Sequence, residues 1–181
     1  ISVATVLPLV GPASSLGLIT QTELAKTTGL GGYLNVLLTD SKTAPVSYAV
    51  DPRITTSILA LGASAPASAT TWLKTLNSSA KSGFWLTYAD SDISGQIQAG
   101  AKKPVQPNIN DLQNIPDPVT GTQWDGLNWP GWAPTLSNVA WPLANSVSPG
   151  VLSATTASGY TRAVLSSGNL SSSAPARSAG R

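Results

Sequence analysis

The sequence predicts an α/β fold in which mainly parallel strands alternate with helices, as a partial or irregular (β/α) barrel. Five short apolar runs each end in Pro, Asp or Asn, as buried parallel strands do when their polar ends gather on one face. They are Thr5–Pro12, Val46–Pro52, Gly83–Asp92, Asn138–Asn145 and Arg162–Asn169. The chain has 181 residues, whereas a complete eight-unit barrel usually needs about 250. We therefore expect an incomplete barrel.

Composition excludes several classes of function. Cys and His are absent, which removes disulfides, thiol nucleophiles, Ser-His triads and the imidazole ligands of most catalytic zinc sites. Charged residues make up 10% of the chain, against about 25% in an average domain. The ten basic residues are scattered, and Lys102 with Lys103 is their only adjacent pair. Without a basic cluster, nucleic-acid binding is not expected.

Export is favoured by the Ser/Thr/Ala-rich, charge-poor composition. No apolar run approaches the length of about 20 residues that a transmembrane helix needs. The chain begins at Ile1 and contains no Met, so we expect a piece of a longer protein. Membrane attachment would then come only through absent parts of that parent.

The first half of the chain carries clear element boundaries. The strand-like run Ser2–Val10 contains Pro8, which strands tolerate near an end or at a sheet edge. Thr20 and Glu23 fit a capping box at a helix start. That helix should stop near Gly29.

A second helix is expected at Tyr33–Leu38 and a strand at Val46–Val50. Asp51 followed by Pro52 matches a cap and first position of a helix that Gly62 closes.

The rest of the chain continues the alternation around one irregular segment. Pro66 opens a helix whose buried face should hold Ala69, Trp72, Leu73 and Leu76. Strands are expected at Phe84–Ala89, Val139–Ala144 and Thr161–Ser166, and helical segments at Ile93–Ala99 and Val151–Ser158. A Pro- and Trp-rich insertion at 101–135 interrupts them. We expect one domain over residues 1–170, and a flexible tail or the start of another unit at 171–181.

Three segments resemble a family of actinobacterial envelope proteins of unknown function: Thr56–Leu76, Phe84–Gly100 and Ser158–Leu170. The most specific motifs of this resemblance are AVDP, which ends at Pro52, and YADSD, which ends at Asp92. Members look like large secreted, membrane-anchored proteins, often encoded beside the lipid II flippase of peptidoglycan synthesis. The resemblance implies an extracytoplasmic setting and a barrel-like domain similar to those of glycoside hydrolases and polysaccharide deacetylases. It transfers no catalytic residues.

Three carboxylates at expected strand ends are the candidate catalytic residues: Asp51, Asp90 and Asp92. Two of them could act as acid and base on a glycosidic bond. Alternatively they cap the helices that follow. A deacetylase-type metal site lacks its imidazole ligands, and no calcium-loop pattern surrounds Asp90 and Asp92. We therefore predict no metal and no cofactor.

Aromatic and amide side chains are the candidate ligand-binding residues: Tyr88, Trp124, Trp129, Trp132 and Asn145. Aromatic faces can stack on sugar rings. Alternatively the Trp residues anchor a Pro-rich loop, and Asn145 forms a turn. The loop would stand over the carboxylates if a helix formed at Ile109–Ile115, and would leave on the opposite face if it formed at Ile93–Ala99. Ser166 and Ser167 have no histidine to act as a base and lie in no nucleophile elbow, so we do not expect either to act as a nucleophile.

These observations predict a noncatalytic extracytoplasmic envelope domain that binds a cell-wall glycan or an envelope protein. The alternative is a glycoside hydrolase-like enzyme that uses the strand-end carboxylates.

Overall fold

The structure is a computed structural model that describes residues 4–13, 17–80, 82–105 and 131–169. Contacts between residues divide the chain into two compact units. Unit 1 comprises Ile1–Ser91 and Gln106–Asn138, and unit 2 comprises Asp92–Val105 and Val139–Arg181. That residues 1–170 act as one domain stays a prediction, and the strands expected in that domain lie in two separate sheets.

Unit 1 is built on a parallel sheet of three strands in the order β1-β2-β3. These are β1 (Thr5–Leu9), β2 (Val46–Val50) and β3 (Gly83–Trp85). Among the described strands β1 pairs only with β2, and its Pro8 lies opposite Ala49. The edge position expected for this proline is confirmed. Proline is tolerated there because an edge strand pairs on one side only, so the missing N–H donor need not break a ladder.

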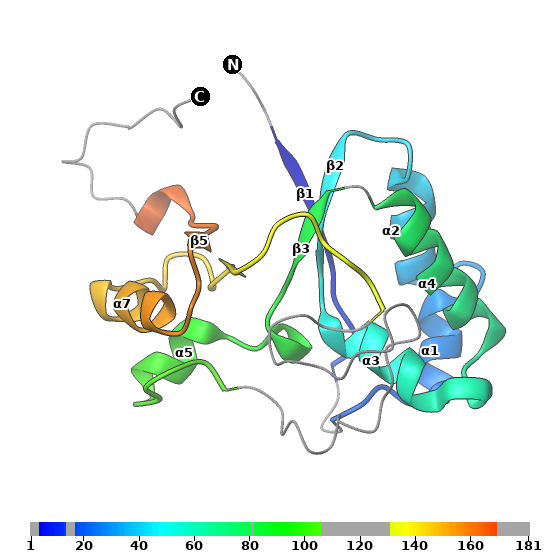
Figure 1. The fold of residues 1–181 in the computed structure, drawn as a ribbon, viewed down its shortest axis with the longest axis horizontal. Coiled ribbons are helices and arrows are strands. Elements are labelled where there is room, and N and C mark those ends of the chain that lie inside the picture. The colour runs from blue at the N-terminus through cyan, green and yellow to red at the C-terminus, as the bar shows by residue number, and fades with distance from the viewer. Residues whose placement is uncertain (1–3, 14–16, 81, 106–130, 170–181) are drawn as a thin grey trace. The chain divides into compact units, whose positions relative to one another are not determined.

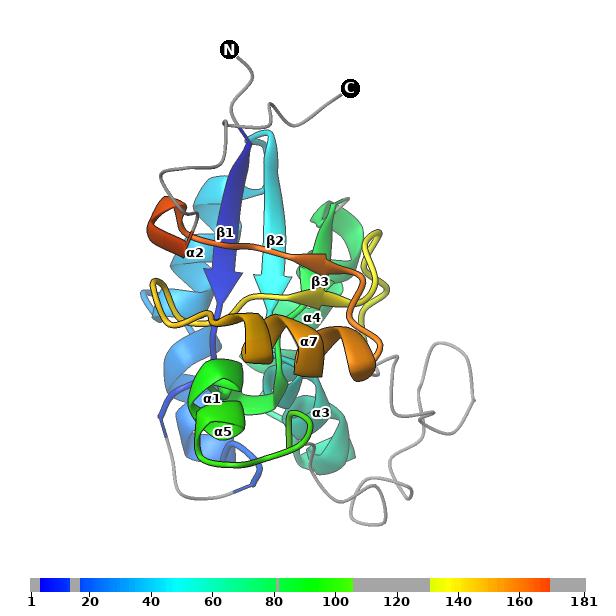
Figure 2. The same cartoon turned by 90° about the vertical axis from the view of Figure 1, so that its left-hand side faces the viewer.

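Helices connect the strands of unit 1, two in each crossover. Between β1 and β2 lie α1 (Gln21–Thr28) and α2 (Tyr33–Ser41). Between β2 and β3 lie α3 (Pro52–Leu61), a 3-10 turn at Gly62–Ser64 and α4 (Ala67–Ser79). Figures 1 and 2 show α1, α2 and α4 together on one face of this sheet.

The predicted boundaries of α1 and α3 are confirmed, whereas α2 runs to Ser41, beyond the expected end at Leu38. Thr20 and Glu23 form a capping box, and Gly29 is the C-cap of α1. Asp51 caps α3 with Pro52 in its first turn, and Gly62 ends that helix with φ of 51°. Local side-chain chemistry therefore determines where these helices begin and end.

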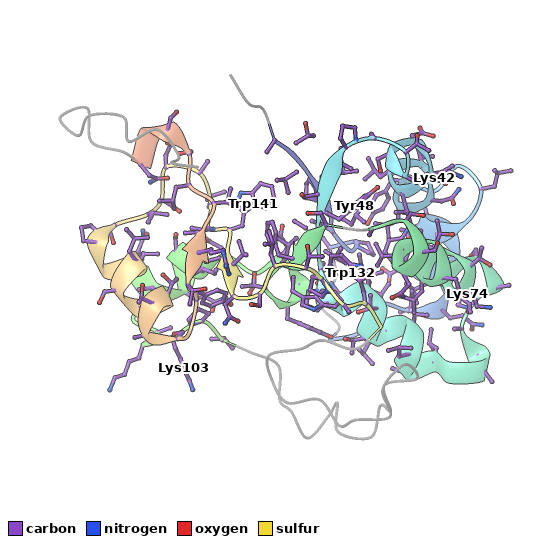
Figure 3. All side chains as sticks on the ribbon, turned by 45° about the horizontal axis from the view of Figure 1, so that its top comes forward. Lys42, Tyr48, Lys74, Lys103, Trp132 and Trp141 are labelled. Atoms are coloured by element: carbon purple, nitrogen blue, oxygen red, sulfur yellow. The ribbon has the colours of Figure 1, made fainter. Side chains whose placement is uncertain are left out.

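The core of unit 1 lies between the sheet and the helices. From β2, Tyr48 and Val50 are buried there, and α4 contributes the four residues expected: Ala69, Trp72, Leu73 and Leu76. The indole N–H of Trp72 donates to the carbonyl of Leu34 at 2.9 Å. Figure 3 shows Tyr48 between strand and helices, whereas the lysines labelled on this unit lie on the outer side of the helical layer.

The third strand is shorter than the sequence predicted. An extended run was expected over Phe84–Ala89, but β3 ends at Trp85 and a 3-10 turn follows at Tyr88–Asp90. Ala89 and Asp90 have φ of 58° and 49°, a left-handed conformation that ends any strand. The apolar pattern indicated the strand but not this reversal.

Unit 2 contains α5 (Ile93–Gln98), β4 (Val139–Ala140), α7 (Pro149–Ala157), β5 (Arg162–Ala163) and a 3-10 turn at Ser167–Asn169. The two strands pair in parallel. Its buried cluster contains Ile93, Ala140 and Val151.

Both strands of unit 2 are shorter than expected from Val139–Ala144 and Thr161–Ser166. The run beyond β4 meets Pro142, which has no N–H to donate to a ladder, and then Asn145, whose φ is 62°. The strand prediction was therefore wrong beyond Ala140.

Parallel strands that alternate with helices are confirmed, so this is a mixed α/β protein. The described strands form two open sheets of three and two strands, and barrel closure is not confirmed. No helix in the described ranges is long and apolar enough to cross a membrane.

Candidate functional site

The carboxyl ends of β1, β2 and β3 meet around one side chain, Asp51. Gly11 follows β1, Asp51 follows β2 directly, and Ala89 lies in the turn after β3. In parallel α/β folds this edge is where ligand sites form, because the loops that leave the strands converge there. It is the candidate functional site of unit 1.

Asp51 is 1% exposed and accepts three backbone hydrogen bonds. Its Oδ1 accepts the N–H of Arg53 and the N–H of Ala89, each at 2.9 Å. Its Oδ2 accepts the N–H of Gly11 at 3.2 Å. The capping alternative is thus confirmed for Asp51, which in addition ties the loops after β1 and β3 to the start of α3.

Burial and hydrogen bonding act on the Asp51 carboxyl in opposite directions. Desolvation raises the pKa of Asp51 from 3.8 to about 6, while the N–H donors and the charge of Arg53 act to lower it. Desolvation is the larger effect, since the group is almost fully enclosed. The carboxyl therefore holds its proton to a higher pH than an ordinary aspartate does.

Arg53 is one of two residues of this site that the sequence interpretation missed; the other is Tyr33. It lies in the first turn of α3 and is 3% exposed. Its Nη1 donates to the carbonyl of Pro12 at 3.1 Å. Its Nε and Nη2 are buried and have no hydrogen-bond partner among the described residues. A positive charge is unfavourable at a helix N-terminus. An arginine directly after the Asp51-Pro52 helix start was therefore the one sequence feature that could have indicated a special role for Arg53.

Two tyrosines border the same region. The hydroxyl of Tyr33 donates to the carbonyl of Val10 at 2.7 Å, and that of Tyr88 donates to the carbonyl of Gly17 at 2.6 Å. Desolvation raises the pKa of Tyr88 to about 12, with the Asp51 charge acting in the same direction. The pKa of Tyr33 is raised for the same two reasons. Both rings therefore lie within electrostatic range of Asp51.

Asp90 belongs to the turn after β3, but no hydrogen bond among the described residues joins its carboxylate to the Asp51 network. Its side chain is exposed, and partial desolvation raises the pKa of its carboxyl. Its φ of 49° follows the 58° of Ala89. Two consecutive non-glycine residues in the left-handed region represent local strain. The Asp51–Ala89 hydrogen bond helps to stabilise this strained turn.

Asp92 and Asn145 belong to unit 2. The Oδ1 of Asp92 accepts the N–H of Ser94 at 2.9 Å and caps α5, so the capping alternative is confirmed here too. Asn145 forms a turn, with its Oδ1 accepting the hydroxyl of Ser166 at 2.8 Å. The three predicted carboxylates are therefore divided between the two units.

Trp132 lies in the core of unit 1, 5% exposed. Its ring meets that of Trp85 edge to face, with centroids 5.0 Å apart. Its ring is covered by the core, which leaves no open face for a sugar. That it anchors the Pro-rich loop stays a prediction. Trp124, Trp129 and the expected helix Ile109–Ile115 lie outside the described residues.

In the described part of the chain, no group of three Asp or Glu residues is arranged to hold a metal ion. The site therefore offers one buried carboxylate, one buried guanidinium and two aromatic rings at the carboxyl end of a parallel sheet.

Fold and site together define a mixed α/β protein with a buried ionisable cluster at its strand ends. Comparison with protein-family models, with curated proteins and with solved structures finds no match to the chain. The resemblance to actinobacterial envelope proteins accordingly stays a prediction.

Proposed function

We propose that this protein is a noncatalytic, extracytoplasmic envelope domain that binds a cell-wall glycan at the carboxyl end of β1, β2 and β3. One observation carries the proposal. Both oxygens of Asp51 are engaged by backbone N–H groups from two loops and the first turn of α3, so this carboxylate organises the site and is not exposed to a reacting bond.

The aromatic rings favour a glycan as the ligand. Tyr33 is 42% exposed, and its hydroxyl is fixed on Val10, which limits the side-chain entropy lost when a sugar stacks on the ring. Tyr88 is fixed in the same way on Gly17. Small-molecule sites are commonly lined by aromatic side chains of fixed orientation together with a few buried polar groups.

A glycoside hydrolase is the second candidate, and the raised pKa of Asp51 favours it. A carboxylic acid with a pKa of about 6 is suited to act as a general acid near neutral pH. Such an enzyme also needs a second carboxylate about 5 to 10 Å from the first, across the scissile bond. Asp90 is the other candidate acid in unit 1, and its side chain is exposed.

The extracytoplasmic setting rests on the family resemblance and on the charge-poor composition. In this proposal the domain acts in the cell envelope, has no nucleic-acid partner and needs no cofactor. A protein of the envelope is the alternative partner.

A pull-down with insoluble peptidoglycan and arabinogalactan tests the proposal. The purified chain should be retained, and soluble sugar should not be released. Tyr33→Ala should weaken retention at least about fivefold, since aromatic stacking contributes about 1 kcal/mol. Val36→Ala is the matched control, because Val36 lies on the same helix and is similarly exposed at 41%.

Each other outcome has a definite meaning. Sugar release that is lost in Asp51→Asn would replace the proposal with the hydrolase. Absence of retention on both polymers would overturn glycan binding and direct the search to protein partners.

A further inference from the structure

The guanidinium of Arg53 uses one of its two hydrogen-bonding edges. Nη1 donates to the carbonyl of Pro12. Nε and Nη2 are buried and lack an acceptor among the described residues. These two atoms lie on the same side of the planar group, so the unused donors form a single edge.

That edge has a specific chemical complement. The N–H bonds of Nε and Nη2 run nearly parallel, with a spacing that matches the two oxygens of a carboxylate. A single carbonyl or hydroxyl oxygen meets both donors only with bent N–H···O angles, whereas the two oxygens of a carboxylate meet each donor nearly in line. The unused edge therefore selects a planar oxyanion over a neutral hydroxyl.

Among the described residues, the neighbouring acids do not fill this role. Asp51 lies two residues away, but its three hydrogen bonds go to backbone N–H groups. Glu23 is engaged with Thr20 in the capping box. Among the described residues the buried Arg53 guanidinium has one neutral hydrogen-bond acceptor, and only through-space attraction to Asp51 and Glu23 offsets its desolvation. An anionic ligand would add a negative charge in direct hydrogen-bond contact.

We propose that Arg53 anchors a carboxylate of the ligand, so that the glycan recognised by this domain carries an acidic sugar. The inference rests on the proposed function and deepens it: Tyr33 and Tyr88 provide aromatic surface, and Arg53 selects the acidic group. Because Arg53 is 3% exposed, the ligand reaches it only when the surrounding chain opens. We therefore expect slow association, because binding requires a conformational change.

The test uses the full chain and four small probes: glucuronate, its uncharged methyl ester, glucose, and the peptide acid acetyl-Ala-Ala. Nitrogen-detected NMR follows the Nε–H signals of the four arginines, with Arg53 assigned by substitution. Glucuronate should shift the Arg53 Nε–H signal saturably. The methyl ester and glucose should leave it unchanged.

Arg53→Lys keeps the charge but lacks the two-donor edge, so it should weaken glucuronate binding at least about tenfold. Arg162→Lys is the matched control, an exposed arginine in unit 2, and should bind as the wild type does. Equal shifts with glucuronate and its methyl ester, or equal losses in the two variants, would overturn the proposal. If Arg53→Lys does not fold, the wild-type titration still decides.

The outcomes separate this inference from the proposed function. Retention on cell-wall polymers without a glucuronate shift at Arg53 would overturn the acidic-sugar assignment alone. A shift with acetyl-Ala-Ala but not with glucuronate would overturn it in favour of a peptide carboxylate.

Discussion

The carboxylate of Asp51 accepts the backbone N–H of Ala89 at 2.9 Å, across 38 positions of sequence. Ala89 has φ of 58° and begins a pair of left-handed residues. The same oxygen, Oδ1, accepts the N–H of Arg53 at the start of α3. One buried acid thus couples a strained turn after β3 to a helix start after β2, and the protonation state of that acid affects both.

Stability should fall as pH rises through the titration of Asp51. Burial raises the folded-state pKa of this carboxyl to about 6, above its ordinary value of 3.8. The folded state then binds the proton more tightly than the unfolded state, so this contribution is complete below about pH 4 and is lost between about pH 4 and 6. The loss should reach up to about 3 kcal/mol. Urea unfolding followed by circular dichroism from pH 3.5 to 7.5 measures it.

Asp51→Asn supplies the reference for this experiment, since an amide does not titrate. Subtracting its unfolding free energy at each pH removes the contributions of the other acids. A difference that grows with pH would contradict the prediction, because it would mean that the three N–H donors outweigh desolvation and hold the folded-state pKa below its ordinary value.

Replacing Ala89 by glycine should stabilise the protein. An alanine in the left-handed region costs about 1–2 kcal/mol, and glycine removes most of that cost while adding about 0.5–1 kcal/mol of unfolded-chain entropy. The expected net gain is about 0.5 kcal/mol, measured as a higher urea midpoint with an unchanged m-value. Ala44→Gly is the control, because Ala44 is exposed and does not have positive φ; it should be neutral or destabilising. A gain as large at Ala44 would show that strain at Ala89 is not the cause.

Local chemistry explains why so much of unit 1 could be predicted. The Thr20–Glu23 capping box and the Asp51-Pro52 start of α3 are each contained within a few residues, so the sequence specifies them without tertiary information. The buried face of α4 follows from helical periodicity in the same way. The position of Asp51 at a strand end was equally visible.

The rest depends on contacts between distant residues. The Asp51 carboxylate accepts hydrogen bonds from the N–H groups of Gly11 and Ala89, which lie 40 and 38 positions away in the sequence. No local sequence pattern predicts those bonds. Burial of Arg53 depends likewise on its contact with Pro12, 41 positions earlier. The left-handed turn at Ala89 and Asp90 carries neither glycine nor asparagine, so the run was interpreted as a longer strand.

Removing the ring of Trp132 should destabilise unit 1. Trp132→Ala leaves a large cavity in the core and should cost about 3–5 kcal/mol. Trp132→Phe keeps an aromatic edge against Trp85 and should cost clearly less. Urea unfolding followed at 222 nm measures both variants, with Leu143→Ala, at a side chain 63% exposed, as a control within about 0.5 kcal/mol of the wild type. A Trp132→Ala protein as stable as wild type would contradict the buried placement.

Asn145 should matter for its backbone conformation as well as for its side chain. Its φ is 62°, its Oδ1 accepts the hydroxyl of Ser166 at 2.8 Å, and its N–H donates to Oδ1 of Asn169 at 3.2 Å. Asn145→Gly removes only the side-chain acceptor, whereas Asn145→Ala also adds left-handed strain. We expect Asn145→Ala to be less stable than Asn145→Gly by about 0.5 kcal/mol, the same balance of strain and chain entropy as at Ala89.

Amide hydrogen exchange gives the local measurement for this pair of variants. The N–H of Val164 donates to the carbonyl of Ala140 at 2.8 Å, so its protection reports on the pairing of β4 with β5 beside the turn. Protection should fall in the order wild type, Asn145→Gly, Asn145→Ala, because each step weakens the turn that joins Asn145 to Ser166. The N–H of Tyr48, which donates to the carbonyl of Ser82 in unit 1, should keep its protection wherever exchange occurs by local opening. Equal loss of Val164 protection in the two variants would assign the whole effect to the lost side-chain hydrogen bond and none to the left-handed backbone.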